Sequence, residues 1–140
     1  MTSMEAFSTV RTGTFLARCA AAAGLALALV LLQLPFRHTI RAVRWARRAG
    51  RRPPTAAQAR ALVEAVRHTG RRWPVRAACM ETSLGTVLAA ALLGRRLHWC
   101  LGVRFSPPPT EYHAWVELPD DGPAGEYTEA GWHHHTALTI

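Results

Sequence analysis

A cysteine and a histidine in this sequence have the setting that nucleophilic thiol chemistry requires. Cys79 stands at the start of a predicted helix, and His113 stands within a predicted strand. Unpaired N–H groups at a helix N-terminus stabilise an anion, so they lower the pKa of a cysteine placed there below the roughly 8.5 of a free thiol. The pair therefore predicts a thiolate nucleophile with a histidine base. For Cys79 taken alone, the alternative is a buried and inert apolar side chain.

The hydrophobic pattern predicts one helix followed by two strands around these residues. From Ala77 to Leu93 apolar residues recur at three- and four-residue steps, and Gly94 stands where a helix C-cap belongs. Residues 97–105 and 112–118 alternate between large apolar side chains and others, which is typical of strands. We therefore expect an α+β fold in which a cysteine-bearing helix packs on a small antiparallel sheet after N-terminal helices.

Three motifs together resemble the transglutaminase-like leader peptidases of lasso-peptide biosynthesis. They are Arg76-Ala-Ala-Cys-Met-Glu-Thr-Ser83, Gly94-Arg-Arg-Leu-His-Trp-Cys-Leu-Gly-Val103 and His113-Ala-Trp-Val-Glu117. The resemblance covers roughly Pro53 to the C-terminus and, more loosely, the helical N-terminal part. It implies a papain-like Cys-His-acid peptidase, the stand-alone protease half of a split maturation protein, that removes the leader from a ribosomally synthesised precursor peptide.

The same resemblance assigns roles and partners. Cys79 matches the nucleophile and His113 the base. A precursor peptide is the implied substrate, and a leader-binding protein is the implied partner for recognising it. A lasso cyclase is a further candidate partner. No cofactor is implied.

The third catalytic residue has two candidates. Glu117 lies about 13 Å from His113 along the same strand, so the orienting carboxylate must come from the next strand. The family places its acid in a strand after a Gly-containing turn, and the matching residue is Glu126. If Asp121-Gly122 forms a two-residue turn, however, hairpin counting places His113 opposite Glu129 or Ala130. Glu129 is therefore the alternate, and for either glutamate the competing interpretation is an exposed edge-strand carboxylate.

Residues 15–36 are the most apolar stretch of the chain. The charge-free part from Cys19 to Phe36 would span about 27 Å as a helix, slightly less than the roughly 30 Å of a bilayer core. We expect a hydrophobic helix packed on the domain or on a partner, with membrane insertion or peripheral membrane contact as the alternative. A signal peptide is disfavoured because no small-residue cleavage site follows the run.

An arginine-rich segment follows. Seven arginines lie between Arg37 and Arg52, which predicts a basic amphipathic helix. Its candidate partners are an acidic peptide with its carrier protein, anionic lipid or nucleic acid. Nucleic acid is not expected, because no stacking aromatic pattern or nucleic-acid-binding motif accompanies the arginines. The competing interpretation is a solvated face that keeps the apolar helices soluble.

The remaining composition bounds the organisation and the compartment. A chain of 140 residues can form one domain with a real core. We divide it into an N-terminal helical region, residues 1–52, and a transglutaminase-like core, residues 53–140. The three cysteines, Cys19, Cys79 and Cys100, predict a reducing, cytoplasmic setting without disulfides, with Cys100 as strand filling. The histidines at 133–135 are not expected to bind a metal, because successive strand residues point to opposite faces.

Two alternatives to a peptidase remain open. One is a non-catalytic transglutaminase-like module that binds a peptide or a membrane, in which Cys79 is incidental. The other keeps the Cys79–His113 site but transfers the acyl group to an amine instead of to water.

Overall fold

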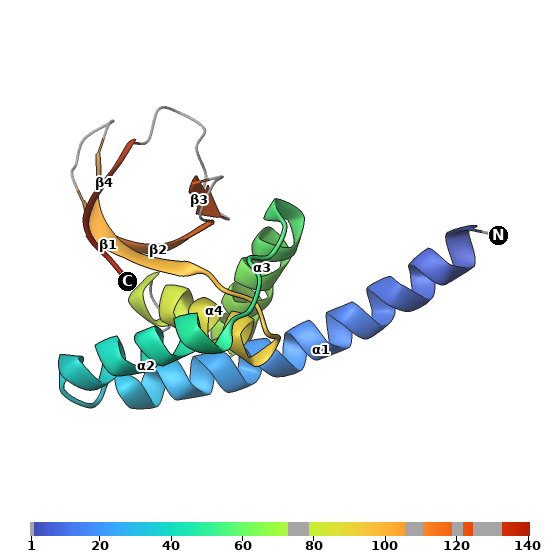
Figure 1. The fold of residues 1–140 in the computed structure, drawn as a ribbon, viewed down its shortest axis with the longest axis horizontal. Coiled ribbons are helices and arrows are strands. Elements are labelled where there is room, and N and C mark those ends of the chain that lie inside the picture. Colours follow the sequence, from blue (N-terminus) through green and yellow to red (C-terminus); the bar gives the residue numbers. More distant parts are fainter. Residues whose placement is uncertain (1, 73–78, 106–110, 119–121, 125–132) are drawn as a thin grey trace.

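The computed structural model describes residues 2–72, 79–105, 111–118, 122–124 and 133–140, with side chains for 15–72, 79–103, 113–118, 123–124 and 136–140. Four helices precede a four-stranded antiparallel sheet (Figure 1). The helices are α1 (Thr2–Leu31), α2 (Phe36–Ala49), α3 (Ala56–Arg72) and α4 (Cys79–Leu92). The strands are β1 (His98–Phe105), β2 (Glu111–Leu118), β3 (Gly122–Ala124) and β4 (His133–Thr139). The predicted α+β class, with a cysteine helix packed on a small antiparallel sheet, is confirmed.

Helix α4 is the centre of the helical layer. It packs against each of the other three helices on one side and against β1 and β2 on the other. Every residue from Ser83 to Ala91 is buried, because a helix enclosed in this way has no solvent face to fill with polar side chains. This burial explains why the helix is apolar around most of its circumference, and it holds the N-terminal residue, Cys79, in a fixed position relative to the sheet.

The closest helix contact is the crossing of α1 over α4. A Cβ atom added at Gly24 would lie 2.4 Å from the carbonyl oxygen of Gly85 and 2.8 Å from the amide nitrogen of Ala89. Only a residue without a side chain allows the two backbones to approach this closely. Around the crossing, α1 buries a face of small and aliphatic residues, namely Ala20, Ala21, Leu25 and Ala28. The prediction of a hydrophobic helix packed on the domain agrees with this arrangement. None of the helices in the described residues has the length and hydropathy needed to cross a membrane.

Local hydrogen bonds define the ends of the other helices. At the start of α3, Thr55 and Gln58 form a reciprocal capping box: the N–H of Gln58 donates to Thr55 Oγ1 at 3.2 Å, and the N–H of Thr55 donates to Gln58 Oε1 at 3.0 Å. Gly94 ends the α4 segment with a φ of 73°, the left-handed conformation that favours glycine. The N–H of Arg51 donates to the carbonyl of Gly94 at 3.1 Å, which ties the end of α2 to the approach to β1.

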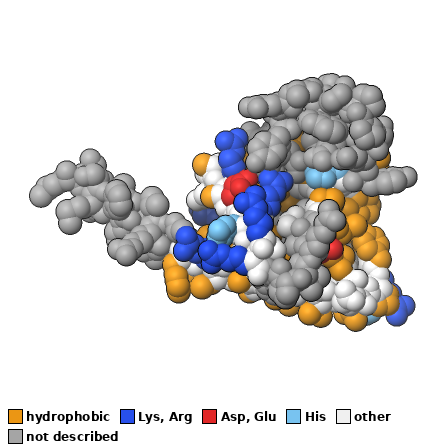
Figure 2. All heavy atoms as spheres, turned by 180° about the vertical axis from the view of Figure 1, so that it is seen from behind, with side chains coloured by type: hydrophobic (Ala, Val, Ile, Leu, Met, Phe, Trp, Pro, Cys, Tyr) orange, Lys and Arg blue, Asp and Glu red, His pale blue; other side chains and the backbone are white. Residues whose placement is uncertain are grey.

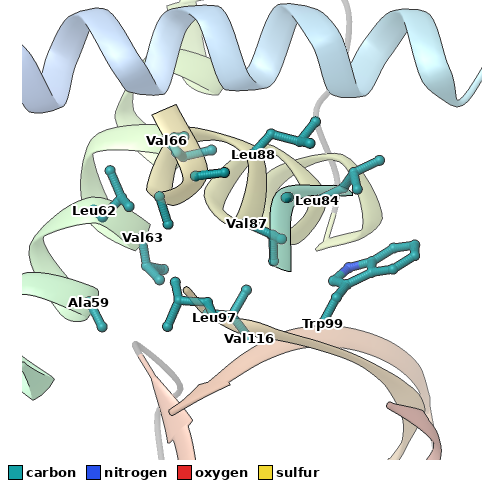
Figure 3. Packing of buried hydrophobic residues seen from close by; sticks show 14 of the residues in the cluster. Ala59, Leu62, Val63, Val66, Leu84, Val87, Leu88, Leu97, Trp99 and Val116 are labelled. Carbon is teal, nitrogen blue, oxygen red and sulfur yellow. The ribbon is translucent and has the colours of Figure 1, made fainter. Parts of the chain in front are cut away.

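The sheet has the strand order β3-β2-β1-β4 and curves strongly (Figure 1). The β1–β2 register pairs Gly102 with His113 and Trp99 with Val116. Trp99 and Val116 point toward α4 and join the hydrophobic core with Leu84, Val87 and Leu97 (Figure 3). The opposite face of β2, which carries His113, Trp115 and Glu117, therefore points away from the centre of that core.

Asp121-Gly122 does not form the two-residue turn that the hairpin counting toward Glu129 assumed. Gly122 belongs to β3 and pairs with Leu118, and Ala124 pairs with Val116. Val116 and Ala124 are both buried, so the register is set by packing two apolar side chains on the same face rather than by the turn preference of an Asp-Gly pair. The hairpin counting that favoured Glu129 loses its basis, because it depended on that turn.

Candidate active site

Cys79 is the first residue of α4 and is half-buried. The first turns of this helix are secured by their own hydroxyl groups: Thr82 Oγ1 donates to the carbonyl of Cys79 at 3.4 Å, and Ser83 Oγ donates to the carbonyl of Met80 at 3.1 Å. Ser83 Oγ also accepts a hydrogen bond from the buried indole N–H of Trp99 at 2.9 Å. The N-terminal end of α4 is therefore anchored directly to β1.

His113 reaches Cys79 from β2. A hydrogen bond between the two side chains is the largest influence on the Cys79 thiol and lowers its pKa. Burial acts in the opposite direction. Backbone hydrogen bonds from Ala114 and Met80 and the charge of His113 add to the lowering, and the net effect is a pKa below the ordinary value. Since a donor stabilises the charged form of an acid, both backbone N–H groups must point toward the sulfur.

The thiolate environment combines two structural elements. The Met80 N–H belongs to the unpaired first turn of α4, where the helix dipole favours negative charge. The Ala114 N–H and the His113 imidazole come from β2. In the described part of the sheet β3 pairs with β2 at residues 116–118, and β2 also packs against α4. The arrangement can hold a thiolate beside a proton acceptor, as nucleophilic catalysis requires.

A tryptophan supports the imidazole. The rings of His113 and Trp115 are stacked, with centroids 5.9 Å apart and an angle of 15° between their planes. Trp115 is 1% exposed, and its indole N–H donates to Glu117 Oε1 at 2.9 Å. The three side chains therefore form a row along one face of β2, with the indole between imidazole and carboxylate. The alternation His-Ala-Trp-Val-Glu is the sequence signal that places these three side chains on one face of a strand, but it gives Trp115 no role.

Cys100 has the opposite chemistry from Cys79. It is fully buried on β1, and burial raises the pKa of its thiol to about 12. Its sulfur lies 3.8 Å from the hydroxyl oxygen of Thr139 on β4. A thiol of this kind is protonated and inaccessible at neutral pH, which agrees with the prediction that Cys100 fills space in the sheet.

The two acid candidates, Glu126 and Glu129, lie outside the described residues. The same is true of Arg76 and its two following alanines, which begin the cysteine motif. The structure thus brings together Cys79 and His113 among the predicted site residues, and the choice of the third member stays a prediction.

The sequence model of the transglutaminase-like superfamily matches residues 21–139, which is most of the chain. The chain belongs to the transglutaminase-like superfamily. Members of this superfamily typically have the fold of cysteine proteases and acyltransferases, so membership supports a cysteine-based catalytic site. Searches among curated proteins and among solved structures give no match. The match begins within α1 and extends almost to the end of β4.

Proposed function

We propose that this protein is a cysteine peptidase that removes the leader from a ribosomally synthesised lasso-peptide precursor. The observation that carries the proposal is the hydrogen-bonded Cys79–His113 pair at the N-terminus of α4, in a chain of the transglutaminase-like superfamily. The resemblance of the three sequence motifs to lasso-peptide leader peptidases supplies the substrate class.

In the proposed reaction the Cys79 thiolate attacks the carbonyl carbon at the leader–core junction, and the proton of the thiol passes to His113. Backbone N–H groups of the first turn of α4 stabilise the tetrahedral oxyanion. The intermediate collapses as His113 protonates the leaving amine, which releases the core peptide. The leader then remains as a thioester on Cys79, and a water molecule deprotonated by His113 hydrolyses it.

We assign the orienting carboxylate to Glu126, because the motif resemblance places the acid of the family in a strand after a Gly-containing turn, and Glu126 is the matching residue. Glu129 is the alternate. Both glutamates lie outside the described residues, so the assignment rests on the motif match.

The test is mass spectrometry of a candidate precursor incubated with this protein and a leader-binding partner. We expect one cut at the leader–core junction, and we expect Cys79→Ala and His113→Ala to abolish it. The exposed Cys19 offers a matched control. The Cys19→Ala variant lacks a thiol that lies far from His113 in the sequence, and it should cleave the precursor at the normal rate. Full activity of the Cys79→Ala variant would eliminate Cys79 as the nucleophile.

The same experiment separates the alternatives. An acyl transferase would give a leader product whose mass includes an added amine in place of water. A non-catalytic module would give no product even when the partner demonstrably holds the leader. Glu126→Gln and Glu129→Gln, compared side by side, identify the third residue: only the loss of the true orienting acid should lower the cleavage rate strongly.

A further inference from the structure

Helix α1 presents an apolar face to solvent. Phe15, Leu16, Leu27 and Val30 are 68%, 52%, 47% and 60% exposed. Cys19, Ala22 and Ala23 are also exposed and lie between them on the same side of the helix. The opposite side carries the buried residues that pack on α4. Between Phe15 and Leu31 the only charged residue is Arg18, so a long stripe of exposed side chains lacks the charges that a solvated helix normally carries.

Helix α2 carries a row of exposed positive charge. Arg37, Arg41, Arg44 and Arg48 recur at three- and four-residue steps, and all are exposed. Trp45 lies at the border of the row and is 58% exposed. The buried side of α2 consists of Thr39, Val43 and Ala46. No acidic residue occurs from residue 6 to residue 63, so the described side chains of these two helices include no carboxylate that could neutralise the arginines.

The two helices lie side by side against α4 (Figure 1). Thr39 Oγ1 donates to the carbonyl of Leu31 at 3.4 Å and so joins the start of α2 to the end of α1. Because both helices bury the sides that face the core, both outward faces are left to solvent. Hydrophobic side chains form much of the lower edge of the molecule in the opposite view (Figure 2). We call the exposed residues of α1 from Phe15 to Val30 together with the arginine row of α2 the outer helix surface.

We propose that the outer helix surface binds an anionic membrane side-on. The stripe on α1 would enter the boundary between headgroups and acyl chains, and the α2 arginines would contact lipid phosphates. The charge of the outer helix surface favours a membrane as the binding partner. An anionic membrane carries negative charge over its whole area, so the four arginines of α2 can pair with lipid phosphates without a fixed alignment. Arginine and tryptophan side chains also suit the membrane interface, where their apolar parts are buried and their polar ends stay in contact with water.

Vesicle flotation of the full chain tests this inference. We expect the protein to float with vesicles that contain phosphatidylglycerol, to remain unbound with phosphatidylcholine alone, and to dissociate as salt is added. Each exposed arginine near an anionic membrane raises the affinity of the protein for that membrane about fivefold. The double variant Arg41→Gln/Arg44→Gln should therefore bind roughly 25-fold more weakly and show a smaller salt dependence. Leu27→Gln/Val30→Gln should also release the protein.

Control variants separate surface effects from misfolding. Arg60→Gln removes an exposed arginine from α3, outside the outer helix surface, and should leave vesicle binding unchanged. The alkylation rate of Cys79 should be the same in all variants, since none touches the thiol. Vesicle binding does not depend on the proposed peptidase activity, so either proposal can fail without the other.

Three results would overturn the inference. One is binding to neutral and anionic vesicles with equal affinity. Another is a dimer in solution that Leu27→Gln/Val30→Gln converts to a monomer, which would mean that a second copy covers the stripe. The third is a leader-binding protein that occupies the surface and is released by the same variants while vesicles are not bound.

Discussion

Replacing Gly24 by alanine should separate the two helices that cross at the centre of the fold. The new Cβ would lie 2.4 Å from Gly85 O, 2.8 Å from Ala89 N and 2.9 Å from Ala89 Cβ, whereas ordinary contacts begin at 3.4 Å. The largest overlap is 3.4 − 2.4 = 1.0 Å. Two of the three opposing atoms belong to the backbone of α4 and cannot rotate away, so α1 has to move by a distance of this order.

Two opposing effects determine how much Gly24→Ala changes the free energy of unfolding. Overpacking of a well-packed core costs about 1–3 kcal/mol, and the separation also weakens contacts of Leu25 and Ala28 with α4. Alanine recovers about 1 kcal/mol of helix propensity relative to glycine. We therefore expect Gly24→Ala to lower the free energy of unfolding by about 1–2 kcal/mol, which corresponds to a melting temperature roughly 3–8 °C lower for a chain of this size.

Urea and thermal unfolding followed by circular dichroism measure this effect. Ala22→Leu is a suitable control, because it enlarges an exposed side chain on the same helix and should change the stability by no more than about 0.5 kcal/mol. An unchanged or raised stability of the Gly24→Ala variant would refute the close crossing, since helix propensity would then be the only term that remains.

Three further predictions concern the sheet and the site. Because the pKa of Cys79 is lowered, its thiolate fraction near pH 6 exceeds that of a free thiol. Iodoacetamide should therefore modify Cys79 faster than the cysteine of a reference peptide, while Cys100 should react only after unfolding. Equal alkylation rates for Cys79 and the reference peptide would contradict the lowered pKa. Ser83→Ala should lower the free energy of unfolding, measured in urea, by about 1–3 kcal/mol, because the buried Trp99 N–H loses its hydrogen-bond acceptor. An unchanged urea midpoint would argue against the hydrogen bond between Trp99 and Ser83. Trp115→Phe keeps a ring against the imidazole but removes the N–H donated to the carboxylate. It should slow Cys79 alkylation at low pH, and an unaltered pH profile would reduce Trp115 to a packing role.

The elements around the site could be predicted because their patterns were long and regular. The apolar steps from Ala77 to Leu93 gave a helix that the structure places at Cys79–Leu92, and the alternation over 112–118 gave β2. In both cases apolar residues recur at the period of the element, which is what the prediction used. The position of Cys79 in the first turn followed directly, and so did the placement of His113 on a neighbouring strand.

Features that depend on tertiary packing could not be predicted in the same way. The Asp121-Gly122 pair has a strong local preference for a turn, but the match between Val116 and Ala124 overrides it. The close crossing at Gly24 left no sequence signal beyond a glycine in an alanine-rich helix. The role of Trp115 depends on a ring contact to His113 and a hydrogen bond to Glu117, and neither follows from alternation alone.

The division into residues 1–52 and 53–140 makes one more prediction possible. In the full chain α1 covers the side of α4 that carries Gly85, and a Cβ at Gly85 would lie 3.1 Å from the Cα of Leu25. The superfamily match also starts inside α1, at residue 21. Removing residues 1–52 would expose this side of α4, which has no polar face of its own. We therefore expect the 53–140 fragment to lack a cooperative thermal transition and to regain one when a peptide of residues 1–52 is added. A fragment that unfolds cooperatively by itself, with Cys79 still reactive near pH 6, would show that α3 and the sheet position the nucleophile without α1 and α2.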